Sequence, residues 1–226
     1  MDLIAGLLEA IAPTRCAGCD LPGGLLCEAC RDSLPRIEMA HACPRCGAPF
    51  GWIVCTECWE TEFSFSEARC VGTLERPLSR CVTLYKDGGE RRLAPVMGAL
   101  LAEALESWRG WPDAVVPIPA SSEALRRRGF DHVFLLAEEI AASLGVGLER
   151  PLVRIGACRD QRRLGREARR LNVRGVLEVR PDTAIPERVL LVDDVFTTGS
   201  TLDEAAAAMM LAGSREVRVC SVARAW

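Results

Sequence analysis

Along most of the chain, apolar residues occur in two kinds of pattern: short segments and helical spacing. Short apolar segments predict strands at 67–74, 113–119, 188–194 and 216–224, and the segments at 113–119 and 188–194 are expected to be buried. Around them, apolar residues recur at helical spacing in 91–105, 132–145 and 201–213. Strands that alternate with helices are typical of a mostly parallel sheet with helices on both faces. The pattern therefore predicts an α/β fold, in which ligands bind where strands end and helices begin.

Cysteine pairs replace this pattern near the N-terminus. Residues 3–11 carry apolar side chains at helical spacing, which predicts a helix that docks on its own domain or, as the alternative, binds a partner. Eight of the 12 cysteines then follow as four C-x2-C pairs. We therefore predict two domains: an N-terminal helix with a double zinc ribbon at 1–62, and the α/β domain at 63–226.

The cysteine pairs have the spacing of metal-binding knuckles. Each C-x2-C turn directs two thiolates at one tetrahedral ion, and the next pair along the chain completes a four-sulfur site. We expect sequential pairing rather than a cross-braced arrangement, which predicts two structural zinc sites: Cys16, Cys19, Cys27 and Cys30, and Cys43, Cys46, Cys55 and Cys58. Disulfides are the alternative, but the chain starts without an export signal, so we expect a reducing compartment.

Composition limits the classes of protein to which this chain can belong. The 226 residues are 49% apolar, enough for one substantial core, and no run reaches the length of a membrane span. We predict a cytoplasmic protein whose net charge of −3 argues against a wholly basic nucleic-acid-binding coat. Lys86 is the only lysine among 28 lysine and arginine residues, which suggests a role in a site. The four unpaired cysteines are expected to be small buried residues: Cys70, Cys81, Cys158 and Cys220.

The stretch VLLVDDVFTTGSTL, residues 189–202, has the composition of a ligand site. A buried strand here ends in two carboxylates, Asp193 and Asp194, which can accept from sugar hydroxyls or bind Mg²⁺. A turn at the start of the next helix follows, and its backbone N–H groups and hydroxyls favour a phosphate: Thr197, Thr198, Gly199, Ser200 and Thr201. A phosphorylated ribose bound with Mg²⁺ satisfies all of these groups.

This stretch resembles the phosphoribosyl-pyrophosphate (PRPP) binding motif of the type I phosphoribosyltransferases. Together with the cysteine pairs, it resembles the competence protein F (ComF) family over nearly the whole chain. The shared segments are YKDGGE (85–90), VPIP (116–119), RRRGFDH (126–132) and the arginine-rich RDQRRLGREARRLNVRG (159–175). The chain departs from the family at Asp131 and His132, where Asn-Gln is usual, at Cys158, where threonine is common, and at Leu177, where phenylalanine is common.

The resemblance implies a type I phosphoribosyltransferase-like domain that binds PRPP with Mg²⁺. It would transfer ribose 5-phosphate to an acceptor that the sequence does not identify, with pyrophosphate leaving. Asp193 and Asp194 would hold the ribose hydroxyls and stabilise the positive charge that develops on the sugar. The alternative is a non-catalytic accessory protein that senses PRPP or handles single-stranded DNA, beside a helicase-like competence protein as partner. A third class is a zinc-ribbon adaptor in which the second domain is only a scaffold.

Nine arginines and two acids lie between residues 150 and 174. Three interpretations stay open: a mobile segment that closes over pyrophosphate, as in type I transferases, a nucleic-acid contact strip, or a solvated charged face. The run lacks the interleaved aromatic residues that stacking on single strands requires. RRRGF (126–130) offers a second anion site, where the resemblance would place pyrophosphate contacts.

Overall fold

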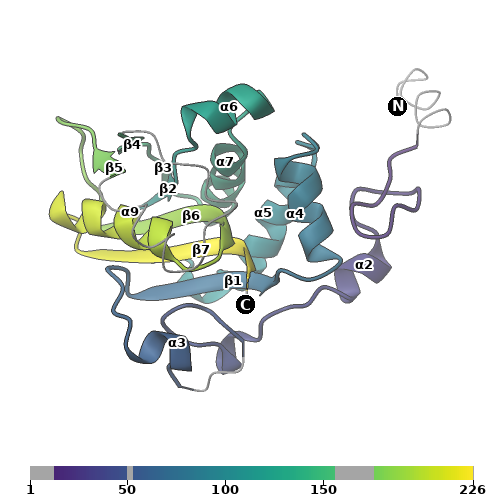
Figure 1. Ribbon diagram of the computed structural model, residues 1–226, viewed down its shortest axis with the longest axis horizontal. Coiled ribbons are helices and arrows are strands. Elements are labelled where there is room, and N and C mark those ends of the chain that lie inside the picture. The colour runs from purple at the N-terminus through teal and green to yellow at the C-terminus, as the bar shows by residue number, and fades with distance from the viewer. Residues whose placement is uncertain (1–12, 50–52, 156–175, 226) are drawn as a thin grey trace.

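A five-stranded parallel sheet forms the centre of the fold in the computed structural model, which describes residues 13–49, 53–155 and 176–225. Its strand order is β1-β7-β6-β2-β3, and each neighbouring pair runs in parallel (Figure 1). The strands are β1 (Glu67–Thr73), β2 (Ala114–Pro117), β3 (Gly147–Leu148), β6 (Arg188–Phe196) and β7 (Glu216–Arg224). This arrangement confirms the predicted mostly parallel sheet, and it brings the carboxyl ends of the strands to one edge.

Helices cover both faces of the sheet, as predicted (Figure 1). One face packs against α4 (Leu78–Lys86), α5 (Leu93–Ala104) and α7 (His132–Leu144), and the other against α9 (Ser200–Leu211). The short helix α6 (Ser122–Arg128) and the 3-10 turn η2 (Glu106–Trp108) complete this part of the chain. Helix α7 begins where the Asp131 carboxylate accepts from the N–H of Phe134 at 3.1 Å, which satisfies one of the free donors of the first turn.

Strand β6 lies at the middle of the sheet because it is apolar on both faces. Leu190 and Val192 belong to the core on the α5 and α7 side, whereas Val189 and Leu191 belong to the core on the α9 side. All four side chains are fully buried. A continuous apolar run suits a parallel strand covered on both faces, and it holds the polar residues that follow it at a fixed place on the sheet edge.

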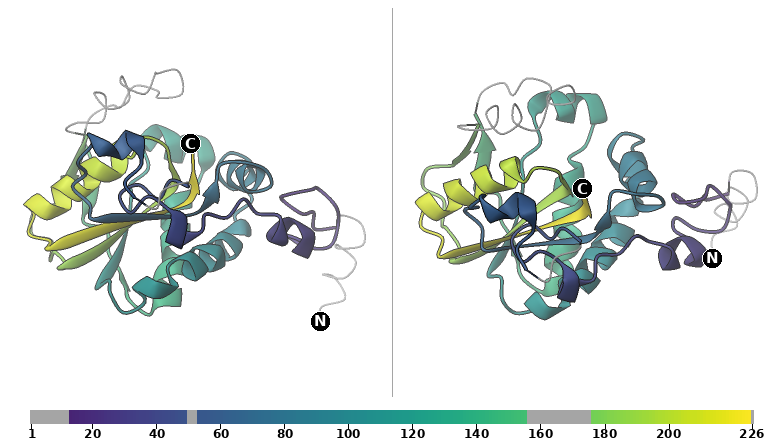
Figure 2. Two further views of the ribbon diagram at one scale, coloured as in Figure 1. Left: turned by 90° about the horizontal axis from the view of Figure 1, so that it is seen from below. Right: turned by 60° about the horizontal axis from the view of Figure 1, so that its bottom comes forward.

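The N-terminal elements run from beside α4 to the edge of the sheet formed by β1 (Figure 2). They are α2 (Glu28–Asp32), η1 (Met39–His41) and α3 (Thr56–Trp59). The second cysteine cluster (Cys43, Cys46, Cys55 and Cys58) packs into the core under α9, beside Phe65 and Phe196. The helix predicted at 3–11 lies outside the described residues, and the domain boundary between 62 and 63 stays a prediction. No helix in the described part of the chain has the length and apolar composition that a membrane crossing requires.

The strands and helices predicted from periodicity after residue 63 are all present within a few residues of their expected bounds. Several elements were not predicted: the helices α2, α3, α4 and α6, the strand β3, and the antiparallel pair of β4 (Leu152–Arg154) and β5 (Leu177–Val179). Helix α4 contains Val82, Thr83 and Tyr85, residue types of modest helix propensity. Burial of Leu78, Val82 and Tyr85 against the sheet stabilises this helix, so tertiary packing decides its structure.

Candidate functional site

Two acidic residues stand at the carboxyl edge of the sheet, near the end of β6. Val192 pairs with Pro117 of β2, and Asp193 pairs with Ser221 of β7, so strands on both sides fix the acids in place. Asp194 is 5% exposed, whereas Asp193 is half-buried. Successive strand residues point to opposite faces, so the two carboxylates have different surroundings.

Asp194 is held by partners from two helices. Its Oδ2 forms an ion pair with Nζ of Lys86, from the end of α4, and contacts Nε2 of His132, from the start of α7, at 3.2 Å. Its Oδ1 accepts from the N–H of Val195 at 2.9 Å. Both oxygens of this buried carboxylate are therefore engaged within the chain.

His132 is itself fixed by neighbours on either side. Its carbonyl oxygen accepts from the Tyr85 hydroxyl at 2.5 Å, and its Nδ1 lies 3.4 Å from Nη1 of Arg128. Since an arginine can only donate, Nδ1 is the acceptor, and Nε2 carries the proton that is donated to Asp194. Arg128 also lies 3.7 Å from a carboxylate oxygen of Asp87. The result is a buried chain of polar contacts that ends at Asp194.

The two acids differ in their affinity for protons. Burial alone would raise the pKa of Asp194, but the hydrogen bond from His132 and the charge of Lys86 lower it well below its usual range. Burial and the neighbouring charge of Asp194 raise the pKa of Asp193 to about 8, although Lys86 opposes this shift. Asp194 therefore keeps its negative charge, whereas Asp193 holds a proton to a higher pH than an ordinary aspartate does.

The 197–201 turn follows β6 and leads into α9, which begins at Ser200. The hydroxyls of Thr198 and Ser200 are 2.8 Å apart, and the Thr198 hydroxyl also accepts from the Ser200 N–H at 3.3 Å. Thr197 is exposed at the entrance of the turn. A helix start with hydroxyl side chains favours an anion, because the free N–H groups and the helix dipole both attract negative charge.

Gly199 is required at the centre of this turn for two reasons. Its φ of +78° lies in the left-handed region, which side chains disfavour. A Cβ atom at this position would lie 2.6 Å from the ring of Phe196 and 3.2 Å from the ring of Phe63. The backbone can therefore approach the aromatic residues beneath the turn only because this residue has no side chain.

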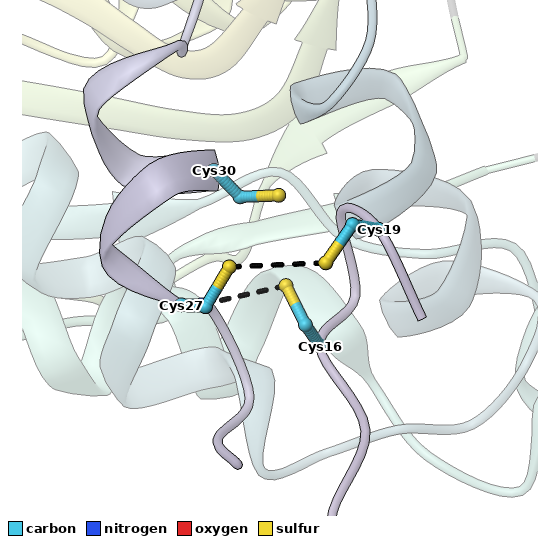
Figure 3. Close-up of side chains that lie close together, drawn as sticks. All are labelled: Cys16, Cys19, Cys27 and Cys30. Carbon is cyan, nitrogen blue, oxygen red and sulfur yellow. Dashed lines mark hydrogen bonds between the residues drawn. The ribbon is translucent and has the colours of Figure 1, made fainter. Parts of the chain in front are cut away.

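The eight paired cysteines form two separate four-sulfur clusters. Within the first cluster (Cys16, Cys19, Cys27 and Cys30) and within the second, the sulfur atoms all lie within 4.8 Å of one another. Figure 3 shows the first cluster, in which the four side chains point toward a common centre. This grouping confirms the sequential pairing of the knuckles.

The surroundings of the sulfur atoms fit a bound zinc ion. Backbone N–H groups of Gly18 and Cys27 point at Sγ of Cys16, at 3.3 and 3.4 Å, and the N–H of Cys55 points at Sγ of Cys43 at 3.4 Å. Thiolate donors with N–H support are the ligands of structural zinc sites.

Not every predicted residue of interest can be located. Cys158 and most of the arginine-rich run, residues 156–174, lie outside the described residues. In RRRGF, Arg126 and Arg127 are exposed at the end of α6, whereas Arg128 is engaged with His132 and Asp87. Among the unpaired cysteines that are described, Cys70, Cys81 and Cys220 are buried, as predicted.

Sequence reasoning did not assign two residues at this edge of the sheet. His132 was discounted because it departs from the family pattern, although it contacts Asp194. Arg224, at the end of β7, was not considered, although it is buried and contacts both the turn and the second cluster. The signal for Arg224 was available, since a basic residue ends the strand directly after the largely apolar run VCSVA. Lys86 was singled out from its rarity, but its partner was not foreseen.

Curated relatives of this chain are named as competence proteins and DNA utilization proteins. The chain is 29% identical to "Competence protein F" of Haemophilus influenzae, over 88% of this chain and 90% of that protein. It is 29% identical to "Competence protein ComFC" of Bacillus subtilis, over 85% and 80%, and 28% identical to "DNA utilization protein YhgH" of Salmonella typhi, over 94% and 97%. The resemblance to the ComF family is thus confirmed over most of the chain. No protein-family model matches.

Solved structures with a similar arrangement include phosphoribosyltransferases. The glutamine PRPP amidotransferase of Bacillus subtilis aligns with a TM-score of 0.37 and 24% identity, over 56% of this chain and 25% of that one. The orotate phosphoribosyltransferase of Aeropyrum pernix aligns with a TM-score of 0.36 and 18% identity, over 65% and 64%. Since these TM-scores are low, the fold class rests on the strand order, the flanking helices and the two cysteine clusters.

Proposed function

We propose that this protein binds PRPP at the carboxyl edge of its sheet, with the ribose on the acid pair and the 5-phosphate on the 197–201 turn. The proposal rests on one observation: the acid pair and the 197–201 turn follow one another directly in the chain. The acids lie near the end of β6, the turn follows that strand directly, and α9 begins inside the turn. A phosphate on the turn would therefore place an attached sugar beside the acids.

Asp193 and Asp194 have different roles in this proposal. Asp194 has both oxygens engaged by Lys86, His132 and the N–H of Val195, so it supplies fixed negative charge and positions Lys86. Asp193 is less buried, and its raised pKa means that it can donate to a ribose hydroxyl as well as accept from one. Ribose recognition is therefore assigned chiefly to Asp193.

Lys86 gives the site a cation next to the acids. Its side chain is 29% exposed, so the ammonium group is partly accessible while it contacts Asp194. The pyrophosphate of PRPP carries several negative charges, and a lysine can bind it as a point charge. Mg²⁺ bound with PRPP beside the acid pair would neutralise the pyrophosphate as it leaves.

We further infer that the protein transfers ribose 5-phosphate from PRPP to an acceptor nucleophile. The bond between C1 of the ribose and the pyrophosphate oxygen breaks, its electron pair leaves with pyrophosphate, and a bond forms between C1 and the acceptor. The sugar becomes positively charged as the first bond breaks, and the fixed charge of Asp194 stabilises it. The acceptor releases one proton to solvent or to a base.

A second candidate is a DNA-handling role without transfer, which the names of the curated relatives favour. The relatives are called competence and DNA utilization proteins, and they align with 85% or more of this chain. In this proposal PRPP binding regulates the protein, and single-stranded DNA with a helicase-like protein are its partners. Two zinc ions would support either role by holding the cysteine clusters closed.

Calorimetry tests the PRPP site that both proposals share. Titrate PRPP, ribose 5-phosphate and pyrophosphate, each with Mg²⁺, into the parent protein and into Asp193→Asn. Ribose binding at Asp193 requires that the variant loses affinity for PRPP and keeps its affinity for pyrophosphate. Equal PRPP affinities would contradict the ribose assignment. A release assay for pyrophosphate with candidate acceptors then distinguishes transfer from binding alone, and a salt titration of oligo(dT) binding tests the DNA role.

A further inference from the structure

Arg224 lies between the second cysteine cluster and the 197–201 turn. It is the last residue of β7 and is 2% exposed. Its Nη1 donates to the carbonyl oxygens of Phe196, at 3.3 Å, and Thr197, at 2.5 Å. Its Nη2 lies 3.9 Å from Sγ of Cys46 and 3.6 Å from a carboxylate oxygen of Glu57. One side chain thus contacts the cluster and the turn together.

The cluster end of this contact supplies the negative charge that a buried arginine needs. Arginine keeps its proton in proteins, so a guanidinium removed from water is stable only beside anions and acceptors. Four thiolates around one divalent ion leave the cluster with net negative charge. Glu57 lies between the ligands Cys55 and Cys58 on α3, so closing the cluster also fixes this carboxylate near Arg224.

The turn end of the contact sets the direction of a backbone donor. The carbonyl of Thr197 and the N–H of Thr198 belong to one planar trans peptide group, and they point in opposite directions. Because Arg224 holds the carbonyl toward the interior, the Thr198 N–H points away from Arg224, on the side of the turn opposite the cluster. The guanidinium also stacks on the ring of Phe196, 4.6 Å from its centroid, directly before the turn.

We propose that Arg224 is a positioning residue that transmits metal occupancy of the second cluster to the 197–201 turn, so that metal bound there increases the affinity of the turn for phosphate. This inference rests on the proposed function for its ligand. The first cluster serves as a comparison. Arg80 donates to the carbonyl oxygens of Cys16 and Ala17, at 3.0 and 2.9 Å, and binds Asp20, so it joins that cluster to α4 rather than to the turn.

The two clusters offer matched variants for the test. Cys27 and Cys55 each precede a short helix, and each donates its N–H to a cysteine sulfur at 3.4 Å. Prepare Cys55→Ser and Cys27→Ser, each with Arg224 or with Arg224→Met. Measure bound zinc, the affinity for PRPP and pyrophosphate, and hydrogen exchange of the peptide that covers 196–201. Circular dichroism verifies that each variant is folded.

We expect Cys55→Ser and Arg224→Met each to weaken phosphate binding on the order of tenfold, the effect of about one charge-assisted hydrogen bond. Combined, they should weaken it no further than either alone, because both interrupt the same contact. Cys27→Ser should leave affinity unchanged. Additive losses, or an equal loss from Cys27→Ser, would overturn the coupling.

Hydrogen exchange keeps this test independent of the ligand. Exchange in 196–201 should rise in Cys55→Ser and in Arg224→Met, and stay at the parent level in Cys27→Ser. The same change should appear when zinc is removed from the parent with a chelator, and it should reverse when zinc is restored. If the parent binds neither PRPP nor pyrophosphate, the proposed function fails, and exchange alone decides the coupling. Unchanged exchange after zinc removal would refute it.

Discussion

Lys86 and Asp194 are 108 residues apart in the sequence, and they form an ion pair at the carboxyl edge of the sheet. Lys86 ends α4, a helix that the sequence pattern did not predict, and Asp194 lies near the end of the central strand β6. His132 binds the same carboxylate oxygen from a third element. The acid that the sequence singled out is therefore part of a buried polar network, and this network determines how it can be used.

Removing Lys86 should destabilise the protein through Asp194. Lys86→Met leaves a buried carboxylate without its cation, and we expect a loss of about 1.5 to 3 kcal/mol in the free energy of unfolding. In the Asp194→Asn background, Lys86→Met should lower the free energy of unfolding much less, because residue 194 then carries no charge that Lys86 compensates. Urea unfolding of the parent, both single variants and the double variant measures this coupling. Equal losses in the two backgrounds would mean that the ion pair contributes nothing.

The two acids should respond differently to substitution by asparagine. Asp193→Asn keeps the network of Asp194 intact, so the fold should be preserved while affinity for PRPP falls, on the order of tenfold to a hundredfold. Asp194→Asn leaves Lys86 without its carboxylate, so both stability and PRPP affinity should fall. Thermal unfolding and calorimetry on the same samples distinguish the two. If Asp194→Asn is as stable as the parent and binds PRPP with the same affinity, Lys86 and His132 do not need the charge of Asp194 to hold their positions.

The raised pKa of Asp193 predicts a specific dependence of stability on pH. The folded-state pKa is about 8, against 3.8 for an unperturbed group, so the folded protein binds this proton more tightly than the unfolded chain. The contribution of Asp193 is therefore fully present below pH of about 4 and decreases until pH of about 8. Asp194, whose pKa is lowered, has the opposite sign and loses its contribution only in acid.

Asp193→Asn should remove this loss of stability with rising pH. With zinc present throughout, the stability of Asp193→Asn relative to the parent should rise as pH increases from 5 to 8, by less than about 1.4 kcal/mol per pH unit. Denaturant unfolding at several pH values gives the difference directly. Parallel curves for the two proteins would show that Asp193 titrates normally in the folded state.

Gly199→Ala should disturb the turn by both strain and contact. The left-handed backbone costs roughly 1 to 2 kcal/mol for a residue with a side chain, and the added Cβ would also meet Phe196 at 2.6 Å. Gly145→Ala is the matched control, because its φ is +70° and nothing lies within 4 Å of the added atom. We expect both variants to lose stability, Gly199→Ala more, and only Gly199→Ala to lose affinity for ribose 5-phosphate. Similar losses in both would assign the effect to strain alone.

Elemental analysis should find about two zinc ions per chain, and about one in Cys27→Ser or Cys55→Ser. The two variants should differ in stability. Cys43, Cys46 and Cys58 pack into the core beneath α9, so opening the second cluster should lower the melting temperature of the sheet domain. The first cluster contacts the rest of the chain through Arg80 and through Ala17, but none of its four cysteines belongs to the cores of the sheet domain, so opening it should lower that melting temperature less. Equal shifts would contradict this asymmetry.

The sequence by itself determined the elements whose signals are local. Continuous apolar runs defined the buried strands, helical spacing defined α5, α7 and α9, and C-x2-C pairs defined both four-sulfur clusters. The acid pair and the 197–201 turn were also readable, because residues adjacent in sequence form both groups. These features depend on backbone periodicity and short-range geometry, which neighbouring residues set.

Only the tertiary structure decided which distant residues meet at the sheet edge. Lys86, His132 and Arg224 come from α4, α7 and β7, and parallel strands with their connecting helices bring them to the same edge as Asp194 and the turn. Periodicity along one segment carries no information about a contact with another segment. The proton on Asp193, the charge on Asp194 and the link from the second cluster to the turn all follow from burial and from charges that the fold brings together.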